Sequence, residues 1–181
     1  AWDNEVQPLA AWRVLGLDRA GDGYARVIEG LPAADDADVI EGYVADSVAP
    51  LLHELGLYQV GLALSERAHC ILRRELGEDD PATLSSAADL GRAHQALGQF
   101  ESSKTVFQNA LATSEAANGP DHPDTLMILS GLAGLWHDLG DYERAFAAYE
   151  RVYEAEKTRE ELVPEALEAC QTNLGQIWES L

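Results

Sequence analysis

Apolar and small residues recur at helical spacing along most of this chain, and the recurrence itself repeats. In the middle of the sequence, one stripe runs from Leu84 to Leu97 and a second runs from Phe100 to Leu111. Residues three and four apart share one face of a helix, so each stretch predicts an amphipathic α-helix. Gly98 separates the two, and glycine readily adopts the left-handed conformation that ends a helix. The pattern predicts a helix, a tight turn and a second helix.

The same unit returns every 42 residues. A Leu-Gly pair with an aromatic residue two positions after the glycine occurs as Leu55-Gly56 with Tyr58, Leu97-Gly98 with Phe100, and Leu139-Gly140 with Tyr142. Pro81 and Pro123 keep the same distance near the start of a unit, and an acidic residue before each proline is suited to cap the first helical turn. A fixed period of this length is typical of stacked units, each too small to bury its own apolar face.

These residues resemble the tetratricopeptide repeat, a helix-turn-helix unit. The Leu-Gly pair of the family's first helix matches Leu90-Gly91, Leu132-Ala133 and Leu174-Gly175, and the small residue of its second helix matches Gly61, Ser103 and Ala145. Small residues there let the two helices approach closely. The 42-residue period, with Leu76-Gly77 leading to Pro81 between units, is similar to the kinesin-light-chain-like variety of the family.

The resemblance implies an all-α fold, a right-handed α-solenoid of tandem helix-turn-helix repeats. Within an array over 37–181, we expect repeats at about 41–80, 81–122 and 123–162 and a terminal helix over 163–181. Residues 1–36 are less regular, and we expect a degenerate pair of helices there. Their apolar stripes are formed by Leu9, Trp12 and Leu15, and by Tyr24, Val27, Ile28 and Leu31.

The family lines a concave groove with residues from the first helix of each repeat, and the resemblance implies the same here. We number the positions of the family's repeat so that Gly91 stands at position 8. The groove positions are then Tyr43, Asp46, His53 and Glu54 in the first repeat; Ser85, Ala88, Arg92 and Gln95 in the second; Met127, Ser130, His137 and Asp138 in the third; and Ala169, Thr172, Gln176 and Glu179 in the terminal helix. Charged and hydrogen-bonding side chains among small ones suit capture of a peptide or helix. Because acids outnumber the single Arg92, we expect the bound peptide to be basic or mixed.

The net charge is −20, from 32 acidic and 12 basic residues. Nucleic acids are therefore not expected as direct partners, since their phosphates need clustered Lys and Arg. Basic proteins would be attracted, although the acidic surface could equally serve solubility alone. No stretch approaches the roughly 18 to 20 apolar residues of a membrane span. Cys70 and Cys170 are expected to be free, buried thiols, and we interpret the chain as cytoplasmic.

One segment resembles a calcium-binding loop. Asp18, Asp22, Gly23 and Glu29 match positions 1, 5, 6 and 12 of an EF-hand, but Ala20 stands where position 3 requires a ligand. A turn between two helices accounts for the segment better, and a calcium-responsive module remains an alternative.

Other chemistry is weakly supported. His53-Glu54 begins like a zinc-protease motif, but Leu57 occupies the place of the second His, and no phosphate-binding loop or nucleophile motif is present. We therefore predict no catalytic residues, no bound metal, no cofactor and no enzymatic activity. His53 and His137 lie beside acids, which raises the hypothesis of a groove that responds to pH.

The sequence predicts a protein–protein interaction scaffold. An alternative is a regulatory or sensor module that packs against an effector domain, such as an NTPase or a transcription activator, of a longer protein. We interpret the chain as such a segment, because it begins without Met and ends where the repeat would next need Gly. The terminal helix carries Trp178 and Leu181, and an apolar patch there predicts possible self-association.

Overall fold

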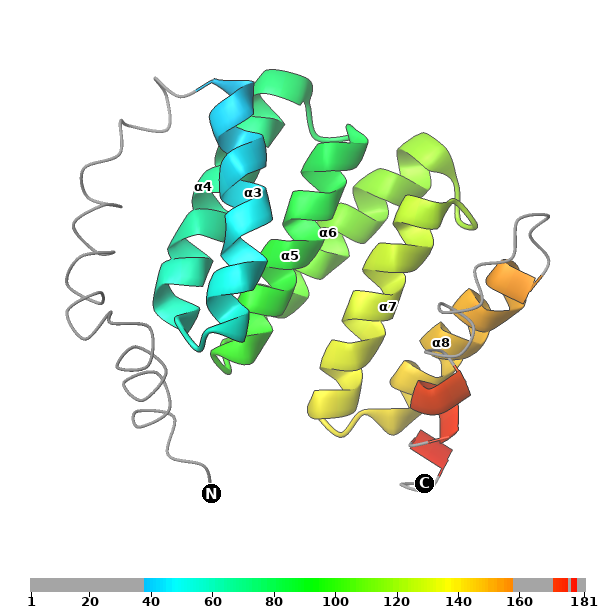
Figure 1. Ribbon diagram of the computed structural model, residues 1–181. Coiled ribbons are helices and arrows are strands. Elements are labelled where there is room, and N and C mark those ends of the chain that lie inside the picture. The colour runs from blue at the N-terminus through cyan, green and yellow to red at the C-terminus, as the bar shows by residue number, and fades with distance from the viewer. Residues whose placement is uncertain (1–37, 158–170, 176, 179–181) are drawn as a thin grey trace. The chain divides into compact units, whose positions relative to one another are not determined.

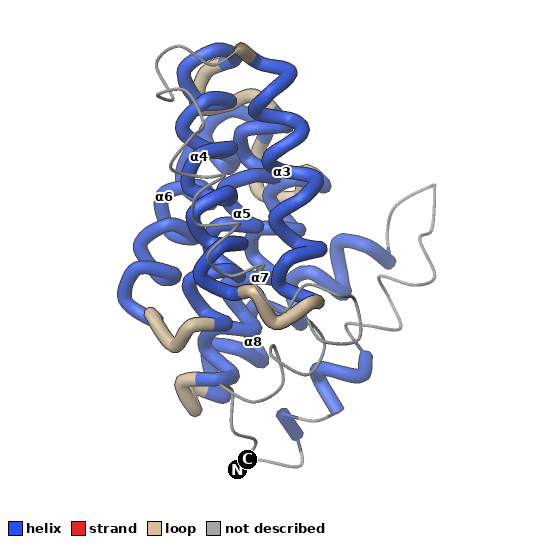
Figure 2. Tube along the Cα trace, turned by 60° about the vertical axis from the view of Figure 1, so that its left-hand side comes forward, coloured by secondary structure: helices blue, strands red, loops and turns tan. Residues whose placement is uncertain are grey.

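The computed structural model describes residues 38–157, 171–175 and 177–178, and within these residues all regular structure is helical (Figure 2). The labelled helices, in chain order, are α3 (Val39–Glu54), α4 (Tyr58–Leu76), α5 (Pro81–Ala96), α6 (Phe100–Asn118), α7 (Pro123–Asp138) and α8 (Tyr142–Lys157) (Figure 1). Residues 171–175 and 177–178 are helical as well. The predicted all-α array of helix-turn-helix repeats is confirmed. The expected helix pair of 1–36, including the calcium-loop residues Asp18, Asp22 and Glu29, lies outside the described residues.

The chain divides into two compact units, residues 1–98 and 99–181. In the first unit, α3 packs against α4 and α4 packs against α5. In the second unit, α6 packs against α7 and α7 packs against α8. Helices that are neighbours in sequence are thus neighbours in space within each unit, as tandem hairpins require. No helix of the described part of the chain is long and apolar enough to cross a membrane.

Left-handed glycines set the ends of the first helices, as the sequence predicts. Gly56, Gly98 and Gly140 have φ angles of 76°, 71° and 76°. The Gly56 N–H donates to the His53 carbonyl at 2.9 Å, and the other two glycines make the equivalent bond at the same distance. Side chains larger than hydrogen are strained in this conformation. The glycines therefore determine where each hairpin turns.

The helix starts follow the capping prediction at one site and depart from it at another. The Asp80 carboxylate, directly before Pro81, accepts from the Ala82 N–H at 2.8 Å. One period later the capping residue is His122, whose Nδ1 accepts from the Asp124 N–H at 3.3 Å. The expectation that an acid caps this second helix is wrong, because the residue immediately before the proline occupies the cap.

Polar side chains of successive repeats meet at different levels in the two units. Between α4 and α5, His69 Nδ1 and Ser86 Oγ lie 3.1 Å apart. Between α6 and α7, Ser114 Oγ and Thr125 Oγ1 lie 2.7 Å apart. The residues one period away from these four are Leu111, Ile128, Leu72 and Thr83. The two hydrogen-bonded pairs therefore occupy different positions of the repeat, although the helices of both units follow the same 42-residue period.

Glycines permit close approach at two helix contacts. A Cβ added to Gly61 on α4 would lie 2.7 Å from His53 Nε2 on α3. A Cβ added to Gly131 on α7 would lie 2.5 Å from Cε1 of Phe107 on α6. The predicted role of Gly61 is confirmed. For Gly175 none of the described residues lies within 4 Å of such a Cβ, and its predicted role stays a prediction.

The terminal helix keeps the phase of the repeat. Ile177 is fully buried in a cluster with Leu126, Leu129 and residues of α8. It lies one period after Leu135, which is also fully buried. Trp178, in contrast, is 72% exposed, so this helix presents one apolar residue inward and the next outward.

Candidate partner-binding face

The predicted groove residues of α3 lie beside its buried face. At about 100° per residue, Asp46 and His53 project to one side of the helix, next to the buried Ala49. Asp46 and His53 are half-buried, while Tyr43 and Glu54 are exposed. These side chains are accessible in part, as contact residues must be.

The four predicted groove residues of α5 differ in exposure. Arg92 is exposed, and Ser85 and Gln95 are half-buried. Ala88 is fully buried. Ala88 is therefore a packing residue in this structure, because its methyl group is enclosed by the helices around it.

The charged centre of the first unit includes a residue that sequence reasoning missed. Asp89, on α5, accepts a hydrogen bond from Arg92 Nη2 at 2.5 Å. Burial raises the pKa of Asp46 to about 6; the Asp89 carboxylate also raises it, and Arg92 lowers it. Two carboxylates from different helices thus repel one another at a partly desolvated place. The i, i+3 spacing of Asp89 and Arg92 was the available sequence signal.

His53 belongs to the contact between α3 and α4 more than to an open groove. Its ring stacks on Tyr58 at a centroid distance of 6.1 Å, and its Nε2 is buried against Gly61 without a hydrogen-bond partner. Burial lowers the pKa of His53, opposed by a backbone hydrogen bond at Tyr58 and by the Asp89 charge. The pH response hypothesised for His53 is therefore displaced below the ordinary histidine range.

The second unit presents its predicted residues along α7. Met127, Ser130 and His137 are half-buried, and Asp138 is exposed. His137 Nδ1 lies 3.6 Å from a carboxylate oxygen of Asp138, and its ring meets the edge of Tyr142 at 5.5 Å between centroids. Thr172 is exposed on the terminal helix. Ala169, Gln176 and Glu179 lie outside the described residues.

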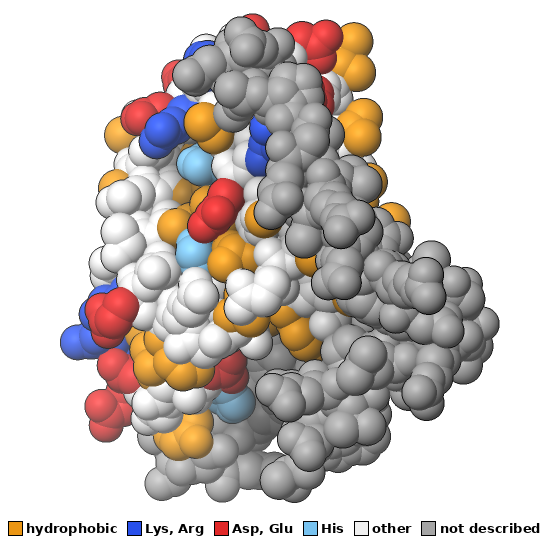
Figure 3. Space-filling model, turned by 90° about the vertical axis from the view of Figure 1, so that its left-hand side faces the viewer, with side chains coloured by type: hydrophobic (Ala, Val, Ile, Leu, Met, Phe, Trp, Pro, Cys, Tyr) orange, Lys and Arg blue, Asp and Glu red, His pale blue; other side chains and the backbone are white. Residues whose placement is uncertain are grey.

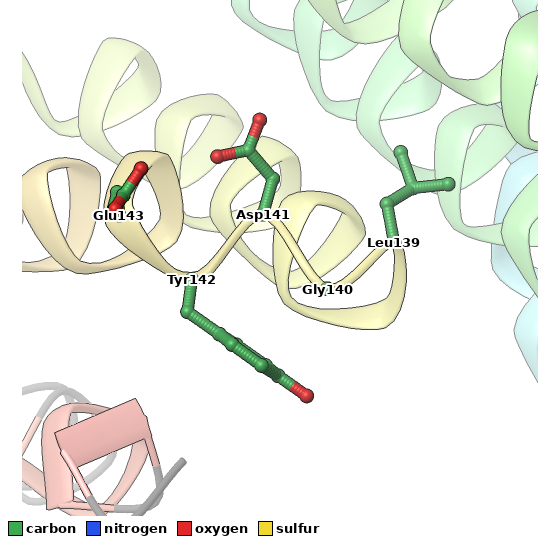
Figure 4. Close-up of a pocket in the computed structure, with 5 residues that line it drawn as sticks. All are labelled: Leu139, Gly140, Asp141, Tyr142 and Glu143. Carbon is green, nitrogen blue, oxygen red and sulfur yellow. The ribbon is translucent and has the colours of Figure 1, made fainter. Parts of the chain in front are cut away.

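The described residues offer little to catalysis or metal binding. They contain no group of three or more His, Cys, Asp or Glu side chains placed to hold a metal ion. An open hollow of about 400 Å³ is lined by Leu139 to Glu143, in the turn between α7 and α8. Its side chains diverge, with Asp141 and Tyr142 on opposite sides of the backbone (Figure 4). Polar groups that diverge cannot act together on one substrate.

The exposure of two side chains bears on further expectations from the sequence. Cys70 is a free thiol and is exposed, so the expectation that it is buried is wrong. Cys170 lies outside the described residues. The exposure of Trp178 leaves self-association through the terminal helix as a prediction.

Helical hairpins with a 42-residue period, left-handed turn glycines and polar first-helix residues define a helical repeat protein. The family model described as "Tetratricopeptide repeat" matches residues 45–108 and 90–157. The chain belongs to this family. Domains built from such repeats are generally protein-interaction modules and are typically non-catalytic.

Solved structures support the same fold. The TPR-like repeats of a kinesin light chain from Podosopora anserina are 24% identical, with a TM-score of 0.68 over 76% of this chain and 65% of that chain. BtubC (BKLC) from P. vanneervenii is 19% identical, with a TM-score of 0.69 over 90% of this chain and 65% of that chain. At these identities the likeness establishes the fold alone.

Curated relatives match over a shorter stretch. Clustered mitochondria protein homologs from Aspergillus oryzae and Aspergillus terreus are each 26% identical over 110 residues, which is 57% of this chain. The matched stretch spans only 9% of the length of those relatives.

Proposed function

We propose that this chain binds a basic segment of a partner protein along the first helices of its repeats. The observation that carries the proposal is a pair of half-buried carboxylates, Asp46 on α3 and Asp89 on α5. Burial and, after it, the Asp89 charge raise the pKa of Asp46. Two repelling, partly desolvated carboxylates are stabilised when a cation comes between them. A lysine or arginine side chain of the partner would supply that cation.

The remaining charges support the same type of partner. Arg92 is already engaged by Asp89, so it reduces the acidity of the face without offering a free clamp for acidic groups. On the second unit, Asp138 adds an exposed carboxylate at the end of α7. The net charge of −20 attracts basic partners at long range, and salt weakens that attraction.

Rigid helices make this mode of binding efficient. The groove-face residues project from helices whose adjoining faces are buried, through Ala49 on α3 and Leu84 on α5 among others. Because the protein side is already ordered, little conformational entropy is lost on its side when the peptide binds.

The proposal is tested by fluorescence anisotropy with labelled twelve-residue peptides that are rich in Lys and Arg, uncharged, or rich in Asp and Glu. We expect binding of the basic set only, with affinity that falls as salt is raised. Asp46→Asn should weaken binding several-fold. The matched control is Glu66→Gln on α4, which removes the same charge from an exposed site on a second helix of the repeat.

Equal losses from Asp46→Asn and Glu66→Gln would contradict the proposal, because binding would then follow net charge alone. Binding of the basic peptides should also weaken between pH 7 and pH 5, since Asp46 becomes protonated over that range. The Asp46→Asn variant should lack this part of the pH dependence.

A second candidate is a regulatory or sensor module that packs against an effector domain, such as an NTPase or a transcription activator. The observation that favours it is that the similar stretch occupies only 9% of the Clustered mitochondria protein homologs, where the repeat is one part of a long chain. Adding a neighbouring domain of the same gene in trans should then produce a complex by gel filtration. The absence of a complex would reject this candidate.

A further inference from the structure

α3 carries a stripe of exposed apolar side chains that is separate from both its core face and its predicted groove face. The stripe consists of Ile40, Val44, Val48, Leu51 and Leu55, with exposed fractions from 37% at Val48 to 67% at Ile40. Their spacing of three and four residues places them in one line. At about 100° per residue, this line lies about 120° around the helix from the buried residues Gly42, Ala45, Ala49 and Leu52. Figure 3 shows hydrophobic side chains scattered among polar and charged ones on the face that it draws.

The repeat indicates what normally covers these positions. One period after Val44, Val48 and Leu51 stand Ser86, Leu90 and Ala93, and two periods after stand Ile128, Leu132 and Leu135. All six are buried. In the first unit α5 packs on the preceding helix α4, and Ser86 is bonded to His69 of that helix. In the second unit α7 packs on α6 in the same way. The stripe is therefore the surface against which a preceding second helix packs.

The chain itself supplies a segment for this surface. Thirty-seven residues precede Asp38, the N-cap of α3. Within them Tyr24, Val27, Ile28 and Leu31 stand at i, i+3, i+4 and i+7, which is the spacing of one apolar helical face. Tyr24 lies 34 residues before Tyr58, which begins α4.

The connection is long enough for this docking. The six residues 32–37 reach at most about 20 Å, enough for the chain to reverse direction before α3. A helix over residues 24–31 is about 10 Å long along its stripe, and Ile40 to Val48 span about 12 Å on α3. An antiparallel helix of this length matches the first half of the stripe.

We propose that residues 24–31 form a helix that docks antiparallel on the Ile40–Val44–Val48 stripe of α3 and caps the array at its N-terminal end. This inference is independent of the proposed function, because it concerns a different face of α3. Without such a cap, the first repeat of a solenoid exposes the face that a preceding repeat would cover.

The test measures access to the stripe in the full chain. Val44→Cys is introduced together with Cys170→Ser, and the rate of alkylation by iodoacetamide is followed by peptide mass spectrometry. The exposed native Cys70 on α4 is the internal reference. We expect Cys introduced at position 44 to react about tenfold more slowly than Cys70. Ile28→Asp should remove this protection.

The control is Arg26→Asp, which exchanges a base for an acid in the same segment, on the side away from its apolar stripe, and so changes the charge by more than Ile28→Asp does. It should leave the protection in place. Ile28→Ala replaces Ile28→Asp if circular dichroism shows that the aspartate variant does not fold, and it should release the protection in part.

The proposal is overturned if the cysteine at position 44 reacts as fast as Cys70 in the parent chain. It is also overturned if protection survives the change at Ile28 but disappears on dilution. That second result would show that another copy of the chain, instead of residues 24–31, covers the stripe.

Discussion

The close contact between Gly131 and Phe107 gives the sharpest test of the structure. Gly131 lies in the interior of α7, and a Cβ at this position would lie 2.5 Å from Cε1 of the fully buried Phe107 on α6. Gly134 lies one turn later in the same helix, and its nearest neighbour, the Tyr149 hydroxyl, would be 3.4 Å from a Cβ. The first distance is a clash and the second is an ordinary contact, so Gly131→Ala and Gly134→Ala form a matched pair.

The two substitutions share one energetic term and differ in another. Alanine is favoured over glycine in a helix interior by about 1 kcal/mol, and both variants gain it. Forcing a methyl group against a fixed, buried ring costs about 1 to 3 kcal/mol, and only Gly131→Ala carries this cost. We expect Gly134→Ala to stabilise the protein by about 1 kcal/mol. Gly131→Ala should be less stable than Gly134→Ala by about 2 kcal/mol.

The measurement is urea unfolding followed by far-ultraviolet circular dichroism, with the second unit monitored separately by hydrogen exchange of α6 and α7. Adding Phe107→Leu to Gly131→Ala should recover part of the loss, because the smaller side chain makes room for the methyl group. Equal stabilisation by both alanine substitutions would refute the reasoning, since it would mean that the Phe107 ring does not occupy the space beside Gly131.

Three further predictions follow from buried and charged contacts. Thr125→Val should destabilise the protein by about 1 to 3 kcal/mol, because it removes the hydrogen bonds to the buried Ser114 hydroxyl and to the half-buried Gly119 carbonyl. Thr83→Val at the equivalent position, where the hydroxyl has no partner, should be neutral or stabilising in the same urea assay, and equal losses would contradict this contrast. Asp46 has a pKa raised from 3.8 to about 6, so its contribution to stability is present below pH 4 and is lost as pH rises through 6. Asp46→Asn should therefore be more stable than the parent at pH 7.5 by about 1 kcal/mol, allowing for solvent screening, and equal to it near pH 4. Arg151→Ala should lower stability by about 1 kcal/mol, because Arg151 Nη2 donates to Glu115 at 3.0 Å and to the Pro120 carbonyl at 2.7 Å. The control is Arg144→Ala, which removes a more exposed i, i+3 ion pair with Asp141 and should have little effect.

The positions of the helices and turns were predictable because they depend on local physics. Gly56, Gly98 and Gly140 end helices through a backbone conformation that favours glycine, and this preference is visible in the sequence alone. The 42-residue recurrence then assigned each helix its partner, since a hairpin buries its apolar face against adjacent hairpins. The burial of Ile177, one period after the buried Leu135, agrees with this recurrence.

The sequence could predict the partner-binding face only in part. The family pattern assigns positions to a face, but it does not state how far each side chain is buried. Ala88 is enclosed and His53 is wedged against Gly61, because in each case a neighbouring helix comes within contact distance. These contacts depend on the spacing between helices, which the period does not specify.

The sequence by itself determined the class of fold, the hairpin boundaries and the acidic character of the chain, because these follow from local conformational preference, periodicity and composition. Only the tertiary structure decided which charges meet and which surfaces stay open. Asp46 and Asp89 affect one another across two helices, and Phe107 reaches Gly131 from another element. The physical reason is that electrostatic coupling and packing depend on distances between elements, and those distances are set by the whole set of side chains between them.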